Sequence, residues 1–89
     1  MNNPLDLEQL DSSVLYDLFY ESGSELGGAL IEQERKARNE GKLDLLKSLM
    51  QEEYDMLDKR DSVKSDDRDA QIACKKAWDN RLRELKERA

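Results

Sequence analysis

The stretch LDLEQLDSSVLYDLFYE, residues 5–21, places its apolar side chains at the spacing of an α-helix. The main stripe consists of Leu7, Leu10, Val14 and Leu18, and it is widened on one side by Leu15 and Phe19. No alternation of apolar and polar residues typical of a half-buried strand interrupts it. We therefore predict an acidic, amphipathic N-terminal helix over about 5–21.

The rest of the chain is also typical of helices. Only four residues are valine or isoleucine, threonine is absent, and the only proline, Pro4, stands where a proline can open a helix. We predict an all-α fold, a small bundle of three to four amphipathic helices with a helical hairpin, forming a single domain over residues 1–89. The expected elements are the helix at 5–21, a central helical hairpin or long helix at about 24–60, and a C-terminal helix at about 66–87.

Glycine residues suggest where these helices end. Ser22 and Glu25 have the spacing of a capping box, with Gly23 between them, and this predicts a break after the first helix. Two interpretations remain for Gly27 and Gly28. Inside a helix each costs about 1 kcal/mol relative to alanine, which close approach of another backbone, such as the first helix folding back, would justify. Alternatively, the loop extends to Gly28.

Gly41 is the second candidate break. Basic residues precede it, as they do at helix C-termini, and glycine is the preferred residue just beyond such an end. No good N-cap follows at Lys42 or Leu43, so one long helix stays as the alternative to a hairpin turn. The stripe expected after Gly41 is Leu43, Leu46, Met50 and Leu57, with Leu49 and Tyr54 beside it. The last helix, capped by Ser65, is expected to bury Cys74, Trp78, Leu82 and Leu85.

Charge is distributed unevenly along the chain. The first 34 residues contain eight acids and no lysine or arginine, whereas all fifteen basic residues follow with the other thirteen acids. The first segment therefore carries −8 and the rest +2, which together give the net charge of −6. Such asymmetry predicts an electrostatic contact within the fold, between subunits or with a basic partner.

Composition indicates a thin core. Of the 89 residues, 37% are hydrophobic and 40% are charged, which leaves a small stability margin for a monomer. We therefore expect a homo-oligomer to complete the bundle. The single cysteine, the lack of a signal-peptide pattern and the lack of a long apolar run favour a cytoplasmic protein without a membrane span.

The side-chain inventory disfavours catalysis. Histidine is absent, which removes the commonest general base and the commonest transition-metal ligand. With one cysteine and no histidine, a Cys/His zinc site cannot form within one chain. We expect no enzymatic activity, no metal site and no cofactor.

These observations favour a non-catalytic protein-protein interaction or regulatory accessory protein that uses its acidic N-terminal helix. The candidate interface residues are Asp11, Tyr16, Asp17, Tyr20, Glu21 and Trp78, the last as either a core residue or an interface anchor. The expected partners are a second copy of the chain and/or another protein with a basic surface. The alternative is a dimeric, nucleic-acid-associated regulator that uses the basic face of the C-terminal helix, although acids interrupt that face and disfavour nucleic acid.

Overall fold

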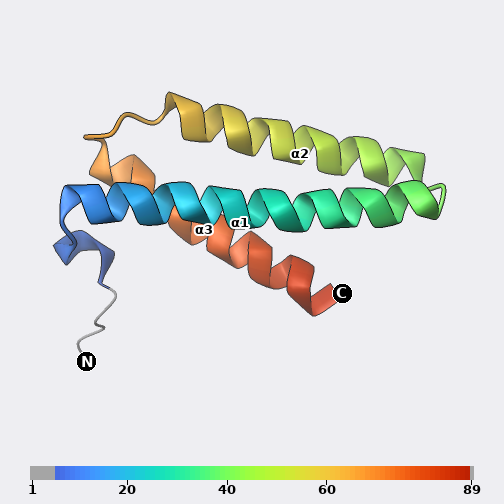
Figure 1. Cartoon of the computed structure of the whole chain (residues 1–89), viewed down its shortest axis with the longest axis horizontal. Coiled ribbons are helices and arrows are strands. Elements are labelled where there is room, and N and C mark those ends of the chain that lie inside the picture. Colours follow the sequence, from blue (N-terminus) through green and yellow to red (C-terminus); the bar gives the residue numbers. More distant parts are fainter. Residues whose placement is uncertain (1–5, 89) are drawn as a thin grey trace.

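The structure, a computed structural model, describes residues 6–88, and these residues form an all-helical bundle. A short 3-10 turn, η1 (Leu7–Gln9), precedes α1 (Ser12–Asn39), α2 (Leu43–Ser62) and α3 (Arg68–Arg88). α2 runs antiparallel to α1, and α3 runs back in the direction of α1 (Figure 1). The predicted all-α fold with a helical hairpin is thus confirmed.

The N-terminal helix begins later than predicted. The carboxylate of Asp6 accepts from Glu8 N and holds the chain in η1, and Asp11 then caps α1 by accepting from Ser13 N at 3.2 Å. The guanidinium of Arg68 donates to Leu10 O at 2.6 Å. Two aspartates and a distant arginine thus satisfy backbone groups that a continuous α-helix would otherwise pair, and before Ser12 the chain forms only the 3-10 turn.

The break predicted between Ser22 and Glu25 is absent, because α1 continues through all of its glycines. A Cβ atom on Gly23 would lie 2.9 Å from Arg60 Cδ and 3.2 Å from Trp78 Cζ3. Side chains of α2 and α3 therefore require a glycine here. The close approach of another backbone that we considered for Gly27 and Gly28 is absent: a Cβ atom on Gly27 would meet the side chain of Met56, and one on Gly28 would meet nothing within 4 Å. The first helix does not fold back, and no loop extends to Gly28.

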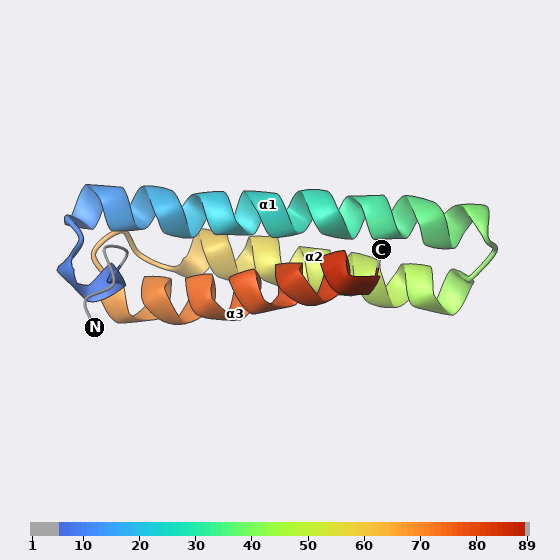
Figure 2. The same ribbon diagram turned by 90° about the horizontal axis from the view of Figure 1, so that it is seen from below.

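The predicted hairpin turn at Gly41 is confirmed. Gly41 has a φ of 72°, which favours glycine. Its N–H donates to Arg38 O at 3.1 Å, and Lys42 N donates to Ala37 O at 2.9 Å, which is the hydrogen-bond pattern of a Schellman motif. The long α1 helix and α2 thus form an antiparallel pair whose tip extends beyond the end of α3 (Figures 1 and 2).

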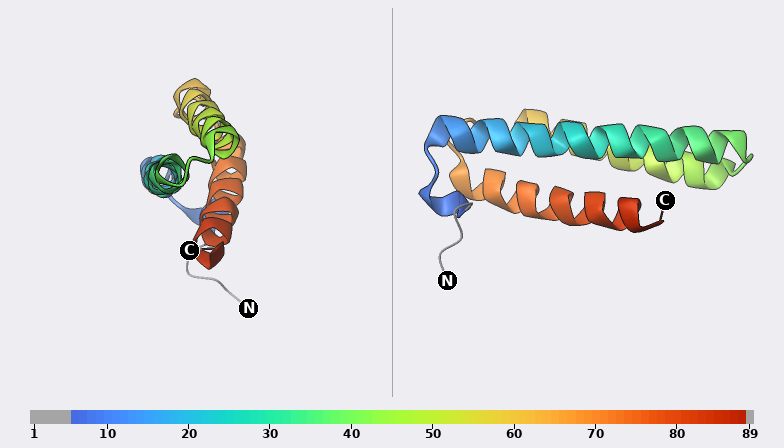
Figure 3. Two further views of the ribbon diagram at one scale, coloured as in Figure 1. Left: turned by 90° about the vertical axis from the view of Figure 1, so that its right-hand side faces the viewer. Right: turned by 60° about the horizontal axis from the view of Figure 1, so that its bottom comes forward.

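The core lies where α1 faces both other helices, while α2 and α3 diverge from each other (Figure 3). Phe19 of α1 stacks on Trp78 of α3 with ring centroids 5.3 Å apart. The buried apolar side chains include Leu15, Phe19, Leu26 and Leu30 of α1, Leu49 and Met56 of α2, and Cys74, Trp78 and Leu85 of α3. Val14, Leu43 and Tyr54 are exposed, contrary to expectation. The buried face of α1 is centred on Leu15 and Phe19, and that of α2 on Leu49 and Met56.

The last helix buries the predicted stripe, with Leu82 half-buried. Its cap differs from the prediction: Asp67, not Ser65, accepts from the backbone, from Ala70 N at 3.2 Å. Gln71 is fully buried and donates from Nε2 to Lys64 O at 2.9 Å. This contact ties the α2–α3 connection to the first turn of α3.

Candidate protein-interaction face

Four of the predicted interface residues meet on one side of α1. Tyr16, Asp17, Tyr20 and Glu21 line a shallow, open depression together with Ser24, with a volume of about 490 Å³. Their spacing explains the grouping, since residues four apart lie one above the other on a helix. We call these five residues the acidic face.

The two tyrosines of the acidic face are held in place by contacts with Phe19 and Arg60. Tyr16 is half-buried and lies 5.7 Å from Phe19 and 6.1 Å from Tyr20, measured between ring centroids. Arg60 of α2 places its Cζ 3.9 Å from the centroid of the Tyr20 ring, and its Nη1 donates to Ser24 Oγ at 3.0 Å. Tyr20 nevertheless stays 40% exposed. The aromatic surface is therefore preorganised and accessible.

The carboxylates of the acidic face are exposed. Among the side chains of residues 6–87, no ion pair includes Asp17 or Glu21. Lys75 of α3 does reach α1, but its Nζ donates to Ser22 Oγ at 2.9 Å and to Asp79 of its own helix at 2.9 Å. The negative charge of this face is thus left open to solvent.

The other two predicted residues lie elsewhere. Asp11 is exposed and caps α1, so its carboxylate has a structural role at the helix N-terminus. Trp78 is only 8% exposed and stacks on Phe19 under Gly23. Within the chain Trp78 is therefore a core residue, and it does not contribute to the acidic face.

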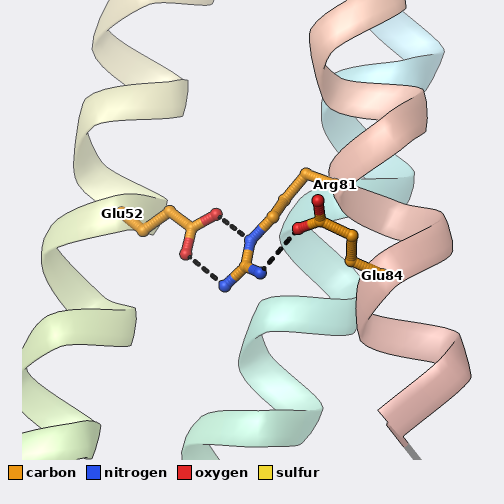
Figure 4. A network of polar contacts seen from close by, with 3 residues as sticks. All are labelled: Glu52, Arg81 and Glu84. Atoms are coloured by element: carbon orange, nitrogen blue, oxygen red, sulfur yellow. Dashed lines mark hydrogen bonds and ion pairs between the residues drawn. The ribbon is translucent and has the colours of Figure 1, made fainter.

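Arg81 connects the two helices that diverge (Figure 4). Its Nε donates to Glu52 Oε2 at 2.7 Å and its Nη2 to Glu52 Oε1 at 2.9 Å, while Nη1 reaches Glu84 at 3.1 Å. The hydrogen bonds to Glu52 are the main reason that the pKa of Arg81 is raised. One cation of the basic C-terminal helix is therefore used inside the fold.

A pair of carboxyl groups between α1 and α2 was not anticipated from the sequence. Glu34 is only 8% exposed, and its buried Oε2 has no conventional hydrogen-bond partner among the described residues. Burial raises the pKa of Glu34 from its ordinary value of 4.5 to about 7. The neighbouring carboxyl of Glu53 also raises this pKa, and the charge of Arg38 lowers it. The helical spacing of Glu34 from Leu26 and Leu30 could have revealed its burial.

Other sites offer less chemistry. Cys74 is a free, buried thiol whose pKa is raised by desolvation. Among the described residues, no group of three or more acidic, cysteine or histidine side chains could hold a metal ion. None of the described helices is long and apolar enough to cross a membrane.

Comparison of the chain with protein-family models, with curated proteins and with solved structures finds no match. Any functional conclusion therefore depends on the geometry of the acidic face.

Proposed function

We propose that this chain is a non-catalytic protein-binding module, and that its acidic face receives a basic surface of a partner protein. The observation that carries the proposal is the depression in which two tyrosines and two exposed carboxylates of α1 lie together. Tyrosine is enriched in protein interfaces because it combines a large apolar ring with a polar tip.

The charge of the face supports a basic partner. Exposed carboxylates steer the encounter with a positive surface and determine register, whereas the apolar rings contribute most of the affinity. Because Arg60 and Phe19 already position the tyrosines, binding would immobilise few additional side-chain rotamers. The face thus combines electrostatic attraction with a low entropic cost of association.

The nucleic-acid alternative receives less support. Two cations of α3, Lys75 and Arg81, have acidic partners inside the fold, in Asp79 and Glu52. The remaining basic side chains of α3 are interspersed with acids, which opposes the multiple phosphate contacts that duplex binding requires. We therefore place protein binding first.

The proposal is tested by affinity capture of the tagged chain from its own cell lysate at low salt, with and without nuclease. The double variant Asp17→Lys/Glu21→Lys should lose a nuclease-resistant partner. The control variant Asp58→Lys/Glu87→Lys changes two exposed acids on α2 and α3, and with them the net charge by the same amount, and it should retain that partner.

Equal capture by both double variants would show that the acidic face is not the binding site. Capture that disappears on nuclease treatment would instead favour the nucleic-acid alternative. In that case a plot of duplex affinity against salt should show a steep negative slope.

A further inference from the structure

One side of α1 carries a straight stripe of exposed residues along most of the helix. The stripe consists of Asp17, Glu21, Ser24, Gly28, Ile31, Arg35 and Arg38, all of them exposed. Their spacing alternates between four and three residues, which is the period that keeps a seam facing a neighbouring helix. We call these seven residues the outer stripe.

The outer stripe lies on the free side of α1. In two perpendicular views, α2 and α3 both lie on the other side of this helix (Figures 2 and 3). Ile31 is 46% exposed within the stripe, and Tyr20 is 40% exposed beside it. Both side chains therefore leave apolar surface open to solvent on this side of the fold, although Arg60 contacts the Tyr20 ring.

The charges of the outer stripe are segregated in a self-complementary order. The acids Asp17 and Glu21 occupy one end and Arg35 and Arg38 the other. Between them lie Ser24, Gly28 and Ile31. Turning a second copy by 180° reverses this order and brings acids opposite arginines at both ends. Such two-fold symmetry is the commonest arrangement of homo-oligomers.

We propose that the partner of the acidic face is a second copy of this chain, docked through the outer stripe with the two α1 helices antiparallel about an axis near Gly28. This inference names the partner for the site of the proposed function and rests on it. Glu21 then lies near Arg35 of the second copy, and Asp17 lies near its Arg38. Each pair occurs twice in the dimer.

Gly28 supports this position of the axis. A Cβ atom on Gly28 would meet nothing within 4 Å, whereas on Gly23 and Gly27 it would contact side chains of the other helices. Packing within the chain thus explains Gly23 and Gly27 but leaves Gly28 unexplained, although glycine disfavours a helix interior. A glycine on the two-fold axis would let two backbones approach closely.

The existing contact of Arg35 does not oppose the dimer. Arg35 pairs with Glu32 of its own helix at 3.0 Å, but both side chains are largely exposed. Such pairs are weak, so the guanidinium can turn to a carboxylate of the second copy. In this register Ile31 lies opposite Ser24 of the second copy, and burial of its apolar side chain would supply affinity that salt does not screen.

The test exchanges one charge pair. Sedimentation equilibrium at low salt should find the full-length chain as a dimer. Glu21→Arg and Arg35→Glu should each weaken self-association by at least about tenfold, because two attractive contacts become repulsive. An equimolar mixture of the two variants should form a heterodimer about as stable as the original dimer, since every opposed pair is then complementary again.

Gly28→Gln provides a control for folding. This change places a good helix former in open space, so the circular dichroism of the monomer should be retained while self-association weakens. The proposal is overturned by a monomeric wild-type chain, by unchanged dimerisation of both charge variants, or by a mixture that stays monomeric.

The outcomes also separate this inference from the proposed function. A monomeric chain that loses a captured protein on Asp17→Lys/Glu21→Lys overturns the dimer and retains the binding role of the acidic face. A chain whose self-association and captured proteins are both unaffected by these substitutions overturns both proposals.

Discussion

The buried carboxyl of Glu34 makes a quantitative prediction about stability. Its pKa of about 7 in the folded chain contrasts with 4.5 for an ordinary glutamate. Between these values the unfolded chain releases a proton that the folded chain keeps. The contribution of Glu34 to stability is therefore fully present below about pH 4.5, falls as the pH rises toward 7, and is lost above it. The substitution Glu34→Gln removes this titration and keeps the size of the side chain.

The magnitude follows from the two pKa values. Each pH unit between 4.5 and about 7 corresponds to about 1.4 kcal/mol, so the contribution of Glu34 to stability should fall by up to about 3 kcal/mol over this range. The groups responsible are Glu34 itself, Glu53 facing it from α2, and Arg38, which reduces the effect. At about pH 8 the glutamine variant should be the more stable by about 1–3 kcal/mol, and at low pH the difference should vanish.

Urea unfolding followed by circular dichroism, repeated from about pH 4 to about pH 8, measures this difference. Glu25→Gln is the matched control, because it makes the same chemical change at an exposed position of the same helix, outside the buried pair. A wild-type chain that does not lose stability relative to Glu34→Gln as the pH rises would refute the reasoning about this buried pair.

Three further predictions concern packing. In urea unfolding of the monomer in high salt, the free energy of unfolding of Gly23→Ala should be about 1–3 kcal/mol lower than that of Gly28→Ala. The reason is that a methyl group at position 23 meets neighbouring side chains, whereas one at position 28 meets none. Trp78→Ala should cost about 3–5 kcal/mol in the same assay and Tyr54→Ala close to nothing, and similar values would contradict their assignment to core and surface. Burial and a raised pKa should make Cys74 react slowly with a thiol reagent at neutral pH and quickly in urea, and rapid labelling of the folded chain would contradict this.

Four of the five residues of the acidic face could be recognised from spacing alone. Tyr16, Asp17, Tyr20 and Glu21 share one side of any helix, so no tertiary information was needed to group them. The support from Arg60 could not be foreseen, because that residue lies 40 positions from Tyr20 in the chain. The same limit applies to Trp78. Its spacing from Cys74 and Leu85 predicts an apolar helix face, but it does not predict whether that face is buried within the chain or by a partner.

The sequence by itself determined the features that depend on neighbouring residues. Apolar spacing and the scarcity of β-branched residues predict helices, and Gly41 marks the hairpin because positive φ and a Schellman motif are local properties. The stripe of the last helix was likewise predictable, since Cys74, Trp78 and Leu85 repeat at helical spacing.

Only the tertiary structure shows where contacts with distant residues override the local helix preference of a segment. In the sequence, Gly23 predicts a helix break, yet α1 continues through it. A glycine fits here because Met56, Arg60 and Trp78 occupy the space where a side chain would be. The start of α1 at Ser12 depends in the same way on the hydrogen bonds of Arg68. In both cases the stabilising contacts join residues that are far apart in the sequence, so local sequence patterns cannot predict them.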